Sequence, residues 1–346
     1  MRVVWVLGIA LSLNGLRVNA EEIPLAPDHP QRYTVVQGDT LWDIAARFLK
    51  QPWQWTRLWQ ANPQIQNPNR IYPGDVLVLT YQNGEPKLVL EREDRNSQPQ
   101  RLQPQIREVP LEEAIPTIPY EAVRQFLTTP KVVTKEEIES SPYIVSLANN
   151  RLIGGSGDTV YVRGSQNARQ GLSYKVFRQG RALKDLKTNE ILGYNAVYIA
   201  DAQLLRPGDP ATFTIGRSVR EVLVGDRLLP VAEETVAMDY HPHPPSRKIQ
   251  GHIIEVLDSV SQIGRYSLVV IDRGQHDGLE LGHVLEIWQQ GNKVLDSVGK
   301  QASEWVTLPE ERSGLVLIFR PFERVSYGIV MEALSPIHLG DLVKQP

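Results

Sequence analysis

The chain has 346 residues and no cysteine, and its 37 basic and 40 acidic residues give a net charge of −3. This length predicts two or three domains. The lack of cysteine excludes a disulfide framework, a haem thioether linkage and a thiolate zinc site, and the balanced charge gives no electrostatic footprint for nucleic acid. The 25 prolines are clustered along the chain, which predicts linkers between the domains.

The first twenty residues are typical of a secretory signal peptide. Arg2 supplies a short positive region, Val3 to Leu13 form an apolar stretch, and Val18 to Ala20 place small residues at a cleavage site. The alternative is a membrane anchor, but the apolar run is too short to span a bilayer of roughly 30 Å. We therefore expect residues 1–20 to be removed and the mature chain to be exported and soluble, with no transmembrane segment elsewhere.

Residues 32–80 predict a compact unit with the order strand, helix, helix, strand. The β-branched stretch Tyr33 to Val36 forms the first strand, and Val76 to Leu79 form the last. Thr40 is expected to cap the first helix, and Asp43 three residues later completes a capping box. Pro52 suits the first turn of the second helix.

The next two segments connect this unit to a strand-rich region. Residues 82–110 are dominated by Gln, Arg, Glu and Pro, which predicts an extended linker with at most one short strand, at Lys87 to Leu90. Residues 111–141 predict an adapter of short helices, one of which begins at Thr134 because two glutamates follow it.

An internal repeat runs through the strand-rich region. Arg163-Gly164 recurs as Arg273-Gly274, Gly171 as Gly282, Gly180 as Gly291, and Gly225-Asp226 as Gly340-Asp341. Glycines at such positions mark tight turns at strand ends. The repeat therefore predicts two related β-rich modules, sandwich-like or barrel-like, at residues 142–232 and 249–346. Residues 233–248 are expected to be a linker, in which His241 and His243 have no partner ligands nearby.

The N-terminal unit strongly resembles a LysM domain. Tyr33 to Ala45, Asn62 to Ile65 and Pro73 to Leu77 carry the resemblance, which covers the whole unit. It implies a βααβ fold that binds N-acetylglucosamine-containing glycans, chiefly peptidoglycan, in a groove between the loops of residues 37–41 and 62–66. The glycan-binding residues that the resemblance implies are Gln37, Gly38, Asp39, Thr40, Leu41, Asn62, Pro63, Gln64 and Ile65.

Several of these residues also have a purely structural explanation. Asp39 and Thr40 suit a turn and a helix cap, and Asn62 suits the end of a helix; both roles can coexist. The tryptophans of the unit are more typical of a core than of a sugar platform. The segment Pro52 to Trp55 is nevertheless richer in tryptophan than a LysM domain requires, which suggests an additional binding or docking surface.

The sequence shows no catalytic, metal or cofactor motif, and we predict no enzyme. Gly154 to Asp158 lack the final glycine of a nucleophile elbow and the strand–helix pattern around it, so we expect a glycine-rich hairpin there. The other histidines show no ligand spacing. Paired glutamates are most simply solvated faces or helix starts, although carboxylates distant in sequence can still assemble a glycan-cutting site.

The order of parts is similar to that of the type IV pilus secretin-associated protein family, whose C-terminal region resembles a domain of the flagellar outer-ring protein. This second similarity is carried by Val269 to Gly274, Gly278-Leu279, Gly282 to Leu285 and Gly340 to Val343. It implies a periplasmic adaptor that binds peptidoglycan through the LysM module and the outer-membrane secretin through residues 142–346. Two alternatives stay open: a LysM-targeted envelope enzyme or hydrolase regulator, and a structural part of a flagellar ring.

The sequence as a whole predicts a multidomain fold. It consists of a small βααβ LysM module followed by a linker and two related β-rich modules.

Overall fold

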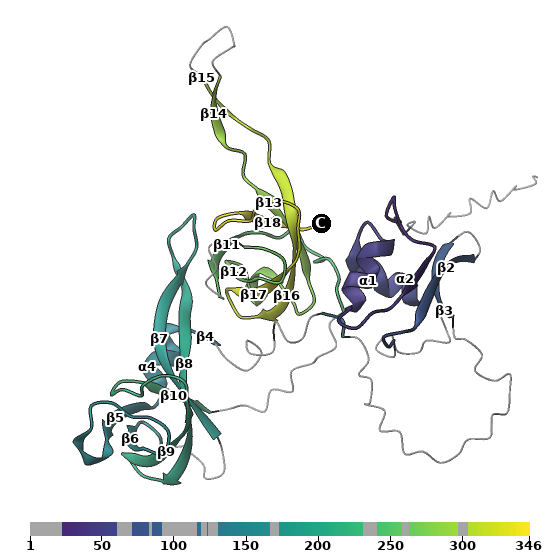
Figure 1. The fold of residues 1–346 in the computed structure, drawn as a ribbon. Helices are drawn as coiled ribbons and strands as arrows, with labels where there is room; N and C mark the ends of the chain where they lie inside the picture. Colours follow the sequence, from purple (N-terminus) through teal and green to yellow (C-terminus); the bar gives the residue numbers. More distant parts are fainter. Residues whose placement is uncertain are drawn as a thin grey trace, which may run out of the picture.

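The computed structural model describes residues 23–60, 71–82, 85–91, 116–118, 123, 131–166, 173–230, 241–257, 263–296 and 304–346 (Figure 1). The predicted signal peptide at residues 1–20 lies outside the described residues, as does Gly171 of the repeat. Among the helices that the structure describes, none is both long and apolar enough to cross a membrane.

The N-terminal module packs two helices on a small sheet. Strand β1 (Arg32–Thr34) is followed by helix α1 (Leu41–Phe48), 3₁₀ helix η1 (Pro52–Gln54), helix α2 (Trp55–Gln60) and strand β2 (Val76–Gln82). β1 and β2 pair antiparallel. The short strand that the sequence allows at Lys87 to Leu90 is present within β3 (Glu85–Glu91). The expectation of a linker from residue 82 is wrong at its start, because β3 pairs with β2 along its whole length and makes the sheet three-stranded.

The hydrophobic pattern of the module explains why the third strand belongs to it. Four residues of α1 recur at helical spacing and are buried, namely Leu41, Ile44, Ala45 and Phe48. They share one core with Trp55, Leu77 and Leu88. Leu88 comes from β3, in which alternate side chains face the core. The module core is therefore closed by a residue that lies beyond the predicted domain boundary.

A first barrel follows the N-terminal module. Its elements are β4 (Lys131–Val133), α4 (Lys135–Ser140), β5 (Tyr143–Leu147), η3 (Ala148–Asn150), β6 (Thr159–Arg163), β7 (Ser173–Lys184), β8 (Ile191–Arg206), β9 (Ala211–Ser218) and β10 (Arg227–Pro230). Six strands close into a ring in the order β5-β6-β9-β8-β7-β10, and β4 pairs with the first half of β8. A helix begins at Thr134 as the sequence predicts, and the structure adds that Thr134 forms a capping box with Glu137.

The second barrel has the same strand order as the first. It consists of β11 (Gln250–Val256), β12 (Leu268–Ile271), η4 (Gln275–Asp277), β13 (Val284–Gln289), β16 (Glu311–Pro321), β17 (Ser326–Ala333) and β18 (Leu342–Lys344). The ring runs β11-β12-β17-β16-β13-β18. When the six strands of each ring are matched in chain order, the two rings are identical.

The repeated Gly-Asp turns show that this equivalence extends to single hydrogen bonds. The amides of Gly225 and Gly340 donate to the carbonyls of Ile144 and Ile253 respectively, both at 2.8 Å. The two glycines have φ angles of 92° and 93°. In each turn the next residue is an aspartate that accepts the amide three residues before it at 2.8 Å. Gly225 and Gly340 therefore mark equivalent positions of two copies of one barrel topology. The expectation of a tight turn is wrong for Gly180, which lies within β7, and for Gly274, which has a φ angle of −136°.

Strand β16 is buried on both of its faces, which accounts for its continuous apolar run. Val316 and Ile318 belong to the interior core of the second barrel. Leu315, Leu317 and Phe319 belong to a separate cluster on the outside of the barrel, which we call the outer cluster. Alternation along a strand places these two sets on opposite faces, so the rest of the chain has to cover the outer set.

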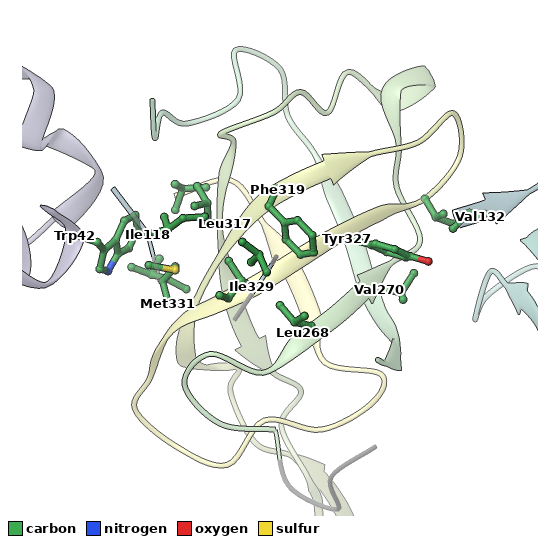
Figure 2. Close-up of a cluster of buried hydrophobic side chains, with 14 of the residues drawn as sticks. Trp42, Ile118, Val132, Leu268, Val270, Leu317, Phe319, Tyr327, Ile329 and Met331 are labelled. Carbon is green, nitrogen blue, oxygen red and sulfur yellow. The ribbon is translucent and has the colours of Figure 1, made fainter. Parts of the chain in front are cut away.

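The outer cluster joins the three parts of the chain. Figure 2 shows Trp42 of α1 and Ile118 beside Met331 at one end, and Val132 of β4 beside Tyr327 at the other. Leu183 and Leu192 of the β7–β8 hairpin also belong to it. Arg273 and Arg324 of the second barrel pair with Asp185 and Glu190 of that hairpin at 3.2 and 2.9 Å. The second barrel is therefore a hub to which the N-terminal module and the first barrel are both docked.

A two-stranded arm projects from the second barrel (Figure 1). It is formed by β14 (Lys293–Asp296) and β15 (Glu304–Thr307), which pair with each other antiparallel. The arm exposes apolar side chains, namely Val294, Leu295, Trp305 and Val306. Its burial pattern differs from that of every other strand of the hub, because all four residues of β15 are exposed.

Candidate functional site

The first loop of the predicted groove is a tight turn built on Asp39. Its carboxylate accepts hydrogen bonds from the hydroxyl of Tyr33 at 2.8 Å and from the amide of Val36 at 2.9 Å. Gly38 occupies the left-handed region at φ +94°, where a side chain would be strained. Burial, and next the contact with Asp39, raises the pKa of Tyr33. Asp39 is therefore an organiser of the loop and is itself buried.

The next two predicted site residues are engaged in the start of helix α1. The hydroxyl of Thr40 accepts the amide of Asp43 at 3.1 Å, and the carboxylate of Asp43 accepts the amide of Thr40 at 3.2 Å. Leu41 is buried in the module core. Within this loop, Gln37 and Gly38 are the two predicted residues that are exposed. Asp39 and Thr40 thus have the structural roles in a turn and a helix cap that the sequence offers as an alternative to glycan binding. Gln37 and Gly38 face outward.

The second loop of the predicted groove is not part of the site that the structure describes. Asn62, Pro63, Gln64 and Ile65 all lie outside the described residues. Of the nine predicted glycan-binding residues, the structure therefore brings together the five from residues 37–41.

A segment from the predicted adapter contacts the first loop, and no sequence pattern indicates this contact. The amides of Leu41 and Trp42 donate to the carbonyls of Pro116 and Thr117 at 3.0 and 3.3 Å. Thr117 and Ile118 are buried. Because the first amides of a helix have no partner within the helix, residues 116–118 complete the capping of α1 and lie against the edge of the predicted groove.

Two tryptophans of the module face the hub and a third faces the module core. Trp42 and Trp53 belong to the outer cluster with Met331, whereas Trp55 belongs to the core of the module. The tryptophan-rich segment Pro52 to Trp55 therefore does supply a docking surface, and the surface docks within the chain. The side chain of Trp59 lies outside the described part of the structure.

Charged groups link the same helix to the hub. The carboxylate of Asp43 pairs with the guanidinium of Arg265 and accepts the hydroxyl of Tyr266 at 3.1 Å. Arg265 also lies over the ring of Tyr266, 4.5 Å from its centroid. Burial, followed by the charge of Asp43, raises the pKa of Tyr266 to about 12. Asp43 therefore caps α1 and holds the hub at the same time.

The prediction that the linker histidines have no partner ligands nearby is wrong for His243. Its backbone forms a bridge with His283 of the hub, and the two rings lie 4.6 Å apart between centroids. With Glu280 they form a group of potential metal ligands within 4.8 Å of one another. The amide of Glu280 donates to Nδ1 of His283 at 3.0 Å. A neutral ring that accepts there carries its proton on the other nitrogen, so we assign no metal site to this group.

The glycine-rich segment Gly154 to Asp158 and the residue His252 have structural roles. Gly154 to Asp158 form a tight turn, in which the amide of Gly155 donates to the Asp158 carboxylate at 2.9 Å. His252, which showed no ligand spacing, is buried, and its Nδ1 lies 3.0 Å from the carboxylate of Asp272, the residue directly after the neighbouring strand β12. Sequence reasoning missed this pair because the two residues are brought together by strand pairing.

Comparison with known proteins identifies the N-terminal module. A family model described as LysM domain matches residues 33–80. The chain is also 36% identical over 60 residues to a protein of Bacillus subtilis (strain 168) named uncharacterized protein YqbP. That alignment covers 14% of this chain and 27% of the relative, so the chain spans about a quarter of the length of the relative it matches. Residues 33–80 are thus a LysM domain, which indicates peptidoglycan binding and an extracytoplasmic or wall-associated protein.

Proposed function

We propose that this protein is a periplasmic adaptor that binds peptidoglycan and anchors an envelope assembly to it, with the type IV pilus secretin as the assembly. The observation that carries the proposal is the LysM domain at residues 33–80. Its first loop presents Gln37 and Gly38 to solvent. A neutral glycan offers hydroxyls, acetamides and apolar ring faces, which suit a shallow groove with exposed backbone and amide side chains.

The two barrels support a binding role in preference to a catalytic one. The described interior of each barrel is filled with apolar side chains, such as Val160 and Phe213 in the first and Ile253 and Val316 in the second. A filled barrel holds no substrate in its interior. We therefore propose that residues 142–346 act as a scaffold without enzymatic activity.

The projecting arm supports a protein partner for this scaffold. Trp305 is 66% exposed and lies on a two-stranded ribbon with other exposed apolar residues. Exposed apolar patches and strands at a sheet edge are the features by which proteins recruit partners. The secretin is the partner that the order of modules favours, through its similarity to the secretin-associated family.

The test of the wall-binding role is a pull-down of the full mature chain on purified peptidoglycan sacculi. We expect the Gln37→Ala, Gln64→Ala double variant to lose most of the bound fraction, while Gln31→Ala, an exposed glutamine of the same module, stays with the wall. Removal of the whole module is a poor control, because Trp42 and Trp53 cover part of the outer cluster. The supernatant is assayed for soluble sugar fragments.

The result decides between the adaptor and the enzyme. Wall binding that depends on Gln37 and Gln64, with no sugar fragments in the supernatant, supports the adaptor. Release of fragments, or undiminished binding by the double variant, would show that the activity or the wall contact lies elsewhere in the chain.

The secretin role is tested separately with purified secretin and the immobilised chain. Trp305→Ala is expected to weaken capture of the secretin, and Tyr81→Ala, which removes an exposed aromatic ring from β2, is expected to leave it unchanged. Equal capture by both variants would remove the arm as the contact, and no capture by the unmodified chain would remove the secretin as the partner.

A further inference from the structure

A cleft of about 570 Å³ lies between the LysM domain and the hub. Its walls come from the first loop and α1 on one side, and from the turn before β12 and the end of β17 on the other. Its lining includes Gly38, Asp39 and Arg47 of the LysM domain and Arg265, Tyr266 and Glu332 of the hub. The volume is within the range of known ligand sites. The predicted glycan loop therefore continues directly into a cleft that the LysM domain does not form alone.

The turn that forms the hub side of this cleft differs from its counterpart in the first barrel. The amide of Tyr266 donates to the carbonyl of Val330, and the amide of Gly157 donates to that of Ile215, at 2.7 and 2.8 Å. The isolated bridges that precede the two turns, Gly154 with Val222 and Ile263 with Ile337, also correspond. Tyr266 thus occupies the position that Gly157 occupies in the repeat, and Arg265 that of Ser156.

Tyrosine is an unfavourable residue for this position. The φ angle is +68° at Tyr266 and +86° at Gly157, and a bulky side chain in this region strains the backbone. The side chain compensates through the contacts it makes. The hydroxyl reaches Asp43 and the ring lines the cleft. The repeat shows that a barrel of this topology forms with glycine there, so the tyrosine serves the cleft and its interface.

The chemistry of the lining suits a saccharide. The carboxylate of Glu332 can accept hydrogen bonds from hydroxyls, and the guanidinium groups of Arg47 and Arg265 can donate to hydroxyl and acetamide oxygens. Asp39 holds the loop at the edge of the cleft. The ring of Tyr266 provides an apolar face with a polar tip. Met331 and Trp42 add apolar wall. This combination matches a sugar unit, which is polar at its rim and apolar on its ring faces.

We infer that the cleft is a second saccharide subsite, in which Arg265, Tyr266 and Glu332 of the hub bind further units of the glycan strand that the LysM loop holds. The inference rests on the proposed peptidoglycan binding and extends it. The hub then contributes directly to wall binding, and affinity depends on the length of the glycan strand.

Calorimetry of the full mature chain with N-acetylglucosamine oligomers tests this subsite. We expect the hexamer to bind more tightly than the trimer. The Arg265→Ser, Tyr266→Gly exchange installs the pair found at the equivalent turn of the first barrel. We expect this exchange to weaken hexamer binding by about tenfold, which corresponds to the loss of one or two polar contacts. Binding of the trimer is expected to stay unchanged.

A second variant separates the subsite from module docking. Glu332 lines the cleft and pairs with Arg312 at 2.7 Å within the hub. Glu332→Gln is therefore expected to weaken hexamer binding a few-fold while small-angle scattering shows an unchanged shape. Arg151→Ala, an arginine of the first barrel paired with Asp158, is the matched control and is expected to bind both oligomers normally.

Three outcomes would overturn the inference. The first is equal affinity of the unmodified chain for trimer and hexamer, and the second is normal hexamer binding by the Arg265→Ser, Tyr266→Gly variant. The third is that only this variant loses hexamer binding and that its shape in small-angle scattering has also changed. Failure of the unmodified chain to bind either oligomer or sacculi would instead contradict the proposed function itself.

Discussion

The two barrels share a strand order but bury different surfaces. In the first barrel, strand β8 alternates between buried and exposed residues toward its end, and Leu205 is 52% exposed. In the second barrel, strand β16 is buried over seven consecutive residues. The first barrel has an interior core and a small cluster outside it, formed by Val133, Ile138, Phe177 and Ala196. The second barrel has an interior core and the much larger outer cluster. The same strand order is thus compatible with different outward-facing residues, and these decide how much of the outer surface is buried.

The equivalent turns of the two barrels show the same change at the level of single residues. The Gly-Asp turns are alike in both copies, because they close the ring. The turn at Ser156-Gly157 corresponds to Arg265-Tyr266 in the copy that meets the LysM domain. Of these two kinds of turn, the one that closes the ring is alike in both copies and the one that faces a neighbour differs.

The largest expected effect comes from the outer cluster. Phe319→Ala leaves a cavity beneath the docked modules and is expected to lower the free energy of unfolding by about 3–5 kcal/mol. Leu205→Ala, on the outside of the first barrel, is expected to change it by less than about 0.5 kcal/mol. Urea unfolding measures both. Similar losses for the two variants would contradict the distinction between the barrels.

The ion pair between the hairpin and the hub gives an intermediate, pH-dependent effect. Amides of Thr188 and Lys187, together with Arg273, lower the pKa of Asp185 to about 2. The lowered pKa means that the carboxylate stabilises the fold above its unfolded pKa of about 4, and that this contribution disappears as the pH falls toward 2. Asp185→Asn is expected to cost about 1–2 kcal/mol at pH 7 and little near pH 2. A loss that does not vary with pH would rule out ionisation as its origin.

The left-handed turn of the first barrel gives a smaller effect. Nothing lies within 4 Å of a Cβ placed on Gly157, so Gly157→Ala meets no steric obstacle. The cost is then that of the backbone alone, about 1 kcal/mol in thermal or urea unfolding. Gly155→Ala, which also meets open space but has no positive φ, is the control. Equal behaviour of the two variants would mean that the turn tolerates any residue.

The smallest expected effect comes from copying an ion pair of the first barrel into the second. Arg178 binds the carboxylate of Asp226 through two nitrogens, at 2.7 and 2.9 Å. Strand pairing places Gln289 at the position equivalent to Arg178, next to Asp341, whose pKa is raised by burial. Gln289→Arg is expected to lower that pKa and to stabilise the fold by about 0.5–1 kcal/mol at pH 7.

The pH dependence of the stability gained by Gln289→Arg is the control for this prediction. A raised folded-state pKa means that ionisation of Asp341 costs stability as the pH rises above the unfolded pKa. The gain from the new arginine should therefore appear only above about pH 4. A gain that persists in acid would point to packing and not to the carboxylate.

The sequence by itself determined the features that depend on local chemistry. The capping box at Thr40 and the helix start at Thr134 formed as predicted, because a hydroxyl and a carboxylate three residues apart satisfy helix amides within one turn. The LysM domain could be recognised because its motif is contiguous. The glycine repeat could be recognised because the ring-closing turns at Gly225 and Gly340 have the same left-handed backbone in both copies.

Only the tertiary structure decided which surfaces meet. Leu88 completes the LysM core from a segment whose composition predicted a linker, because one strand with three apolar residues is too short a signal to outweigh its polar surroundings. The pairing of Asp43 with Arg265, of His243 with His283 and of Trp42 with Met331 joins residues far apart in the chain. Such contacts arise from the closing of barrels and the burial of outward faces. These are properties of the whole fold that no local pattern encodes.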